Sequence, residues 1–157
     1  MNAGFFILSL ISISTILLTS YVTYEILHGA WSTLLRIKIA PRMHVLFIIG
    51  PIFIAHMINI WIYGAVYFLV ENYTALGELT GHIEKATLTL QSFESRLYFS
   101  ASTYASLGLG EIVPKGSLRM LASAEVLHGL IMIGWTVSLT YLAMEKFWSM
   151  PVRKKDI

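Results

Sequence analysis

Two long stretches of the chain carry no Asp, Glu, Lys or Arg, and they constrain the fold more than any other feature. They run from Met1 to Tyr24 and from Met43 to Val70, and each exceeds the roughly 20 apolar residues that a helix needs to cross a bilayer. We therefore predict two membrane-spanning helices. The whole chain, with 56% hydrophobic and 13% charged residues, has the composition of a membrane protein.

A third apolar stretch, from Met120 to Met144, contains one acid, Glu125. A carboxylate within the bilayer is costly unless it faces protein or water. We expect a third spanning helix whose acid is paired or functional. The first stretch has a cleaved signal peptide as its alternative, but it lacks a basic n-region and an A-x-A-like cleavage site, so we expect it to stay in the protein.

Basic residues mark one side of the predicted membrane protein. They are Arg36, Lys38 and Arg42 between the first two helices, and Lys146, Arg153, Lys154 and Lys155 near the C-terminus. The positive-inside tendency places both groups in the cytoplasm. The N-terminus is then outside, the C-terminus is cytoplasmic, and the segment from Glu71 to Arg119 faces or re-enters from outside.

A short apolar and aromatic segment follows a polar turret in this external part. It runs over residues 92–104, where Ser92 can cap a helix with Glu94 in its first turn. The segment is too short to span a membrane. We expect a re-entrant helix, which is allowed at membrane depth only where protein covers the irregular backbone after it.

The irregular backbone contains two glycines at alternate positions, Gly108 and Gly110. A row of carbonyl oxygens that replaces the water around a cation needs backbone angles that glycine adopts freely. The Ser106 hydroxyl would add an oxygen layer, while Leu107 and Leu109 would point away from the axis and pack against the short helix. One chain supplies one wall of such a path, which implies a homotetramer.

The sequence Thr103-x-x-Ser-Leu-Gly-Leu-Gly-Glu111, with Pro114 downstream, resembles the Thr-x-x-Thr-Val-Gly-Tyr-Gly-Asp signature of potassium channels. A spanning helix, turret, pore helix, filter and inner helix follow in that family's order over Met43–Phe147. The chain is especially similar to small bacterial two-helix channels, and a Gly-Leu-Gly filter also occurs in some two-pore-domain potassium channels. The resemblance implies K⁺ bound at the carbonyls of residues 106–110, within a bacterial inner (plasma) membrane and its lipids.

Two residues depart from the potassium-channel pattern. Leu109 cannot make the hydrogen bond with which the family's tyrosine holds the filter at fixed width. Glu111 replaces a shorter aspartate at the outer mouth, where four copies would form an acidic ring that attracts cations. A weakly selective monovalent or divalent cation channel is therefore the alternative to a potassium channel.

A second alternative belongs to a different class of protein. His56 and His128 lie on predicted neighbouring helices, where imidazoles can bind a haem iron, although no second pair or attachment motif accompanies them. The chain would then be a non-conducting accessory or haem-binding membrane subunit. His56 with Asn59 is more simply an interhelical hydrogen-bonding patch.

The third helix carries a stripe of residues at three- to four-residue spacing, which is our candidate pore lining. The stripe contains Leu130, Gly134, Val137 and Tyr141. In the family pattern Gly129 takes the position of a gating hinge, with Gly134 as a second small residue and Trp135 beside it. Close helix packing through these glycines is an equal alternative.

Glu125 and His128 lie on the rear of the same helix, away from the stripe. At a spacing of three residues they can pair. The two roles we consider are support of the filter and sensing of pH.

These expectations define an all-α membrane protein with three transmembrane helices, a re-entrant pore helix and a selectivity-filter loop. The expected parts are an N-terminal extra transmembrane helix (1–27), a cytoplasmic basic linker (28–42), a pore domain (43–147) and a cytoplasmic tail (148–157). Within the pore domain we expect an outer helix (43–71), a turret (72–91), a pore helix (92–104), a filter (105–111) and an inner helix (118–147).

Several function classes find no support in the sequence. No nucleophile and base, phosphate loop or zinc-binding spacing is present, so we expect neither an enzyme nor a cofactor other than bound cations. The net charge of +2 is too small and dispersed for a nucleic-acid partner. Cysteine is absent, which excludes disulfides.

Overall fold

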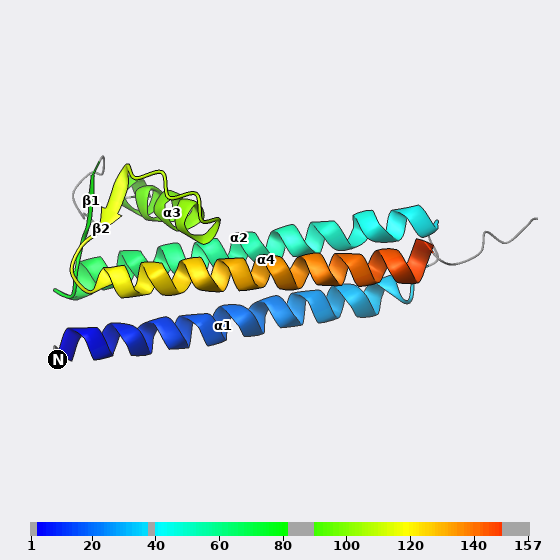
Figure 1. The fold of residues 1–157 in the computed structure, drawn as a ribbon, viewed down its shortest axis with the longest axis horizontal. Coiled ribbons are helices and arrows are strands. Elements are labelled where there is room, and N and C mark those ends of the chain that lie inside the picture. The colour runs from blue at the N-terminus through cyan, green and yellow to red at the C-terminus, as the bar shows by residue number, and fades with distance from the viewer. Residues whose placement is uncertain (1–2, 38–39, 82–89, 149–157) are drawn as a thin grey trace, which may run out of the picture.

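Three long helices lie side by side, and a short fourth helix packs beside one end of them (Figure 1). The structure is a computed structural model that describes residues 3–37, 40–81 and 90–148. Its elements are α1 (Ala3–Leu34), α2 (Pro41–Tyr73), β1 (Leu79–Gly81), α3 (Leu90–Tyr104), β2 (Ile112–Pro114) and α4 (Leu118–Trp148). Helices α1, α2 and α4 are long and apolar enough to cross a membrane. The predicted all-α membrane fold is confirmed.

The short helix and both strands lie at the same end of the molecule as the N-terminus (Figure 1). Helix α3 contacts the neighbouring α2 and α4. The chain thus leaves α2 at this end, turns inward through α3, and returns to the same end before α4 begins. That path is what a re-entrant helix requires.

Two helix boundaries differ from the predicted ones. Helix α1 continues to Leu34, beyond residue 27. Helix α3 begins at Leu90, so Ser92 lies inside the helix rather than at its N-cap, and Glu94 lies beyond the first turn. Leucine and glutamine are good helix formers, which lets the helix start before the serine. Lys38, turret residues 82–89 and tail residues 149–157 lie outside the described residues.

A two-stranded antiparallel sheet, which the sequence did not predict, closes the segment between α2 and α4. Leu79 lies opposite Pro114, and Gly81 lies opposite Ile112. Gly81 has a φ of +136° and approaches the Glu111 carbonyl so closely that a Cβ would clash with that backbone. Only glycine fits there, because it has no Cβ and tolerates positive φ.

The buried side chains form two clusters along the helix bundle. The larger one lies where α3 packs on α2 and α4, and it includes Tyr63, Tyr67, Phe99 and Leu121. The smaller one lies toward the other end and comprises Leu34, Ile48, Ala143 and Phe147. Many large apolar side chains on α1 and α2 stay exposed in the single chain, as expected of helices that face lipid.

Candidate functional site

The end of α3 sets the direction in which the following loop leaves. The Ser106 N–H donates to the Thr103 carbonyl (2.9 Å), and the Leu107 N–H donates to the Ser102 carbonyl (2.8 Å). These two bonds are those of a Schellman helix ending, in which one residue after the helix is left-handed. That residue is Ser106, with a φ of +59°. A left-handed conformation costs a non-glycine residue about 1–2 kcal/mol, so the helix end holds Ser106 under strain.

Positive φ recurs at every second residue of the loop. Ser106 has a φ of +59°, Gly108 of +57° and Gly110 of +79°. Among the described residues, Ser106 is the only non-glycine with positive φ. The two glycines that the sequence singled out thus have the backbone angles for which glycine was expected, and the sequence reasoning missed that Ser106 shares them.

The two leucines of the loop differ from the prediction. In the single chain Leu107 is 64% exposed and Leu109 is 54% exposed, so they are not packed against the short helix as expected. Residues 106, 108 and 110 instead line a groove of about 580 Å³ against α3, β2 and α4. Positive φ occurs at residues 106, 108 and 110, and the groove is lined by these three residues and by neither leucine.

A tyrosine on α3 holds the outer end of the loop. The Tyr98 hydroxyl donates to a carboxylate oxygen of Glu111 at 3.2 Å. Loss of hydration, and after it the Glu111 carboxylate, raise the pKa of Tyr98 above its ordinary value. Leu109 has no group for such a bond, and the sequence reasoning did not identify Tyr98 as a substitute.

Helix α3 is fastened to its neighbours by three polar residues spaced four apart, Arg96, Ser100 and Tyr104. Such a spacing places them on one helix face. At the middle position the Ser100 hydroxyl donates to Glu125 (2.6 Å). The other carboxylate oxygen of Glu125 accepts from the Tyr67 hydroxyl (2.6 Å). Glu125 is fully buried, and this satisfied acid links α2, α3 and α4.

The last of the three residues connects α3 to both α2 and α1. The Tyr104 hydroxyl lies 3.0 Å from His56 Nδ1 and accepts from Asn59 Nδ2 at 3.1 Å. The Asn59 amide also donates to the Thr23 hydroxyl of α1 (2.9 Å). The predicted hydrogen-bonding patch of His56 and Asn59 is therefore confirmed, and it reaches the helix end from which the loop departs.

The predicted pair of Glu125 and His128 does not form. His128 instead bonds the Ser20 hydroxyl through Nε2 (3.1 Å) and the Tyr63 hydroxyl through Nδ1 (3.3 Å). The three-residue step along α4 carries the two side chains into different spaces, since Glu125 faces α2 and α3 while His128 faces α1 and α2.

The two histidines of the haem alternative both take part in interhelical hydrogen bonds. Both ring nitrogens of His128 are hydrogen-bonded, and His56 uses its second nitrogen with Thr136 (3.1 Å).

The stripe on α4 is uncovered in the single chain. Leu130 is 52% exposed, Val137 63% and Tyr141 64%, and a Cβ added to Gly134 would meet nothing within 4 Å. Gly129 differs, because a Cβ there would clash with the backbone carbonyl of Tyr104. This geometry assigns close packing to Gly129.

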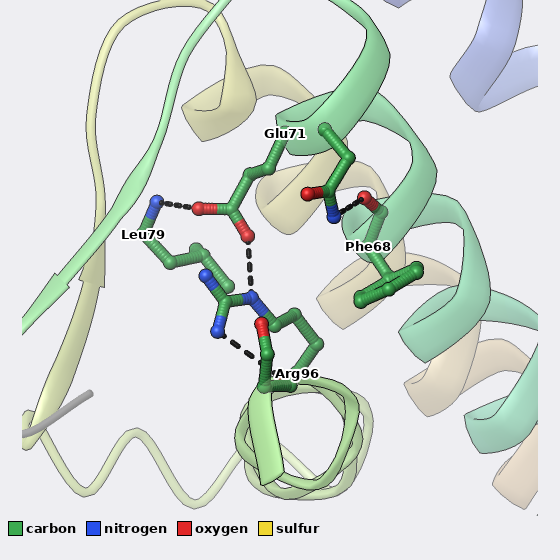
Figure 2. Close-up of polar contacts among 6 residues, drawn as sticks. Phe68, Glu71, Leu79 and Arg96 are labelled. Carbon is green, nitrogen blue, oxygen red and sulfur yellow. Dashed lines mark hydrogen bonds and ion pairs between the residues drawn. The ribbon is translucent and has the colours of Figure 1, made fainter. Parts of the chain in front are cut away.

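A buried ion pair anchors the first of the three polar residues of α3. Arg96 Nε donates to Glu71 Oε2 at 2.7 Å, and Figure 2 shows that the other oxygen of Glu71 faces Leu79. The sequence reasoning passed over both residues. The signal was available, since Arg96 lies in a segment that the sequence predicts to re-enter the membrane, where a buried charge needs a partner.

One protein family matches the part of the chain that contains most of these elements. A family profile described as "Ion channel" matches residues 55–146, which is more than half of the chain. The match takes in the second half of α2, all of α3, the loop and nearly all of α4, and it leaves α1 outside. No curated protein and no solved structure gives a significant match.

Proposed function

The chain belongs to the ion-channel family, and from this premise we propose that it is one subunit of a homotetrameric potassium channel. In this proposal K⁺ passes through the membrane passively and binds the backbone carbonyls of residues 106–110. Glu111 forms an acidic ring at the outer mouth. No chemical reaction is involved.

The observation that carries this proposal is the run of positive φ at residues 106, 108 and 110. It occurs in an exposed loop that starts from a firmly held helix end. Alternating backbone hand is a way to bring successive carbonyls to one side of a chain, and a row of carbonyls can replace the hydration shell of a cation. A Gly-rich turn that only connects two helices would not need this regular alternation.

The tetramer is supported by the apolar surface that the single chain leaves uncovered around the loop. Leu107 and Leu109 are more than half exposed, as are Val137 and Tyr141 on α4. Four copies around one axis would bring the loops together and place the α4 stripe along the ion path. The remaining exposed faces would contact lipid.

The orientation rests on the positive-inside tendency. Arg36 comes shortly after the last residue of α1, and Lys146 lies in the last turn of α4. These two helix ends lie opposite the end that carries α3 and both strands (Figure 1), which favours a cytoplasmic position for them. The loop, both strands and the N-terminus would then face outside.

A weakly selective cation channel is the second candidate, and Leu109 is the observation that favours it. Its side chain cannot donate a hydrogen bond, and at the end of the loop next to β2 the described residues show a side-chain bond to α3 from Tyr98 to Glu111. Reversal potentials in gradients of K⁺, Na⁺ and Ca²⁺ separate the two candidates, because a potassium channel follows the K⁺ gradient alone.

The proposed path is tested by flux from liposomes with K⁺, Na⁺, Li⁺ or Ca²⁺ gradients, comparing wild type with Gly110→Ala. An added Cβ at Gly110 meets nothing within 4 Å, but the φ of +79° is unfavourable for alanine. The variant therefore tests the backbone angle rather than a clash, at a cost of about 1–2 kcal/mol per subunit. We expect K⁺ flux in wild type and its loss in Gly110→Ala.

The matched control is Gly50→Ala, on the exposed side of α2, where a Cβ also meets nothing within 4 Å and φ is helical. It should retain wild-type flux. Full K⁺ flux with wild-type ion preference in Gly110→Ala would refute the assignment of residues 106–110 as the filter.

A further inference from the structure

One buried carboxylate touches two of the segments that frame the loop. Glu71, near the end of α2, accepts from Arg96 Nε of α3 at 2.7 Å through Oε2. Through Oε1 it accepts from the Leu79 N–H of β1, also at 2.7 Å. Figure 2 shows the carboxylate between these two donors, with one oxygen directed to each.

The two segments that Glu71 joins hold opposite ends of the loop. Helix α3 ends at Tyr104, from which the inner end of the loop departs. Strand β1 pairs with β2, and β2 begins at Ile112, directly after the outer end of the loop. A further bond from the Lys115 N–H to the Glu78 carbonyl (2.8 Å) fastens the same two strands beyond β2. Helix α3 and strand β1, which hold the two ends of the loop, therefore both bond to the side chain of Glu71.

The ion pair between Glu71 and Arg96 is buried, so both charges have lost their hydration. The side chains of Arg96 and Glu71 are only 1% and 3% exposed, and a second donor of Arg96, Nη1, is satisfied by the Ser92 carbonyl (3.0 Å). Desolvation often cancels the stability that a buried ion pair adds, whereas removal of one partner leaves a costly unpaired charge. The pair is therefore expected to add little to the stability of the fold. Its geometry, in contrast, holds α3 and β1 at a fixed distance from each other.

We propose that Glu71, through Arg96 and Leu79, is a positioning residue for ion selection that sets the spacing between the inner and outer ends of the loop. This inference rests on the proposed function. Ion discrimination by carbonyls depends on the geometry with which they surround the ion, so a change in the anchor should alter which ions pass.

Two variants test the anchor in the full-length protein. Glu71→Asp keeps the charge but shortens the side chain, so one of the two donors must move or lose its bond. The double variant Glu71→Gln/Arg96→Met keeps an amide oxygen for the Leu79 N–H and removes both charges, which avoids an unpaired buried ion. Glu94→Gln is the matched control, because Glu94 lies on the same helix and is exposed.

The measurement is the Na⁺ to K⁺ permeability ratio from reversal potentials of reconstituted channels. This ratio does not depend on how much protein folds. We expect both anchor variants to change it by about two- to fivefold, in the range of coupling between contacting residues, and Glu94→Gln to leave it unchanged.

The outcomes separate the inference from the proposed function. If wild type conducts and either anchor variant conducts with the wild-type ratio, Glu71 only stabilises the fold and the inference is wrong. If reconstituted wild-type protein carries no cation current, the proposed function fails and the inference falls with it.

Discussion

The substitution Gly129→Ala tests the close contact between α4 and the end of α3, from which the loop departs. An added Cβ would lie 3.0 Å from the Tyr104 carbonyl carbon and closer still to its oxygen, whereas carbon atoms in contact sit about 3.5–4.0 Å apart. Helices α3 and α4 would have to separate by at least ~0.5 Å. The obstacle is backbone, so no side chain can rotate away.

The expected magnitude follows from two opposing effects. Alanine favours a helix interior over glycine by about 1 kcal/mol, and overpacking typically costs about 1–3 kcal/mol. Because the clash is with rigid backbone, we expect a net loss of about 2 kcal/mol per subunit. A loss of this size lowers the melting temperature of a chain of this length by roughly 4–8 °C.

The assay is thermal unfolding of the purified protein in detergent, followed by flux in liposomes. Gly50→Ala serves as the control, because its Cβ meets nothing within 4 Å and only the gain in helix propensity remains. Its melting temperature should equal or exceed that of wild type. We expect Gly129→Ala to melt lower and to conduct with altered ion preference, since Tyr104 ends the helix from which the loop departs.

The melting temperature of Gly129→Ala also tests the close contact between α4 and the Tyr104 carbonyl. If Gly129→Ala melts like Gly50→Ala, α4 does not approach the Tyr104 carbonyl closely in the working protein. A change in channel opening without a change in stability would then favour the hinge interpretation of Gly129.

Two further predictions concern hydrogen bonds of α3. Tyr98→Phe removes the donor to Glu111 at an exposed site, so stability should change by less than about 1 kcal/mol, while K⁺ current should decay faster; an unchanged time course would contradict the role of this bond. Glu125→Gln keeps an acceptor for Tyr67, and Ser100 can turn fully to the Ile60 carbonyl that lies 3.0 Å away, so a small effect on unfolding is expected. Glu125→Ala strands the buried Tyr67 hydroxyl and should cost about 1–3 kcal/mol. If the acid only supports α3, Glu125→Gln also keeps the wild-type pH dependence of flux.

The spanning helices and the glycines of the loop were predictable because each follows from a strong local constraint. Absence of charge over the stretch from Met43 to Val70 leaves few structures other than a spanning helix. Gly108 and Gly110 were identifiable because their residue type has one main conformational use. These predictions needed no knowledge of which helices are neighbours.

The contacts of buried polar residues were not predictable in the same way. A helical projection assigned Glu125 and His128 to one side of α4, but that side faces three different helices. The rotation and rise between residues 125 and 128 of α4 decide which neighbouring helix each side chain contacts. The strain at Ser106 was also hidden, since it arises from the hydrogen bonds that end α3 rather than from the residue itself.

Helix α1 lies outside the family match, yet its polar residues bond to side chains that contact Tyr104 at the end of α3. Thr23 accepts from Asn59, which donates also to the Tyr104 hydroxyl, and Ser20 bonds His128 of α4. Within a bilayer an unsatisfied polar group costs several kcal/mol, so removal of α1 would leave Asn59 and His128 short of partners next to lipid. Because Tyr104 ends the helix that precedes the loop, we expect the loss of α1 to disturb the loop through Asn59. Helix α1 therefore supplies hydrogen-bond partners to α2 and α4, the two long helices that lie within the family match.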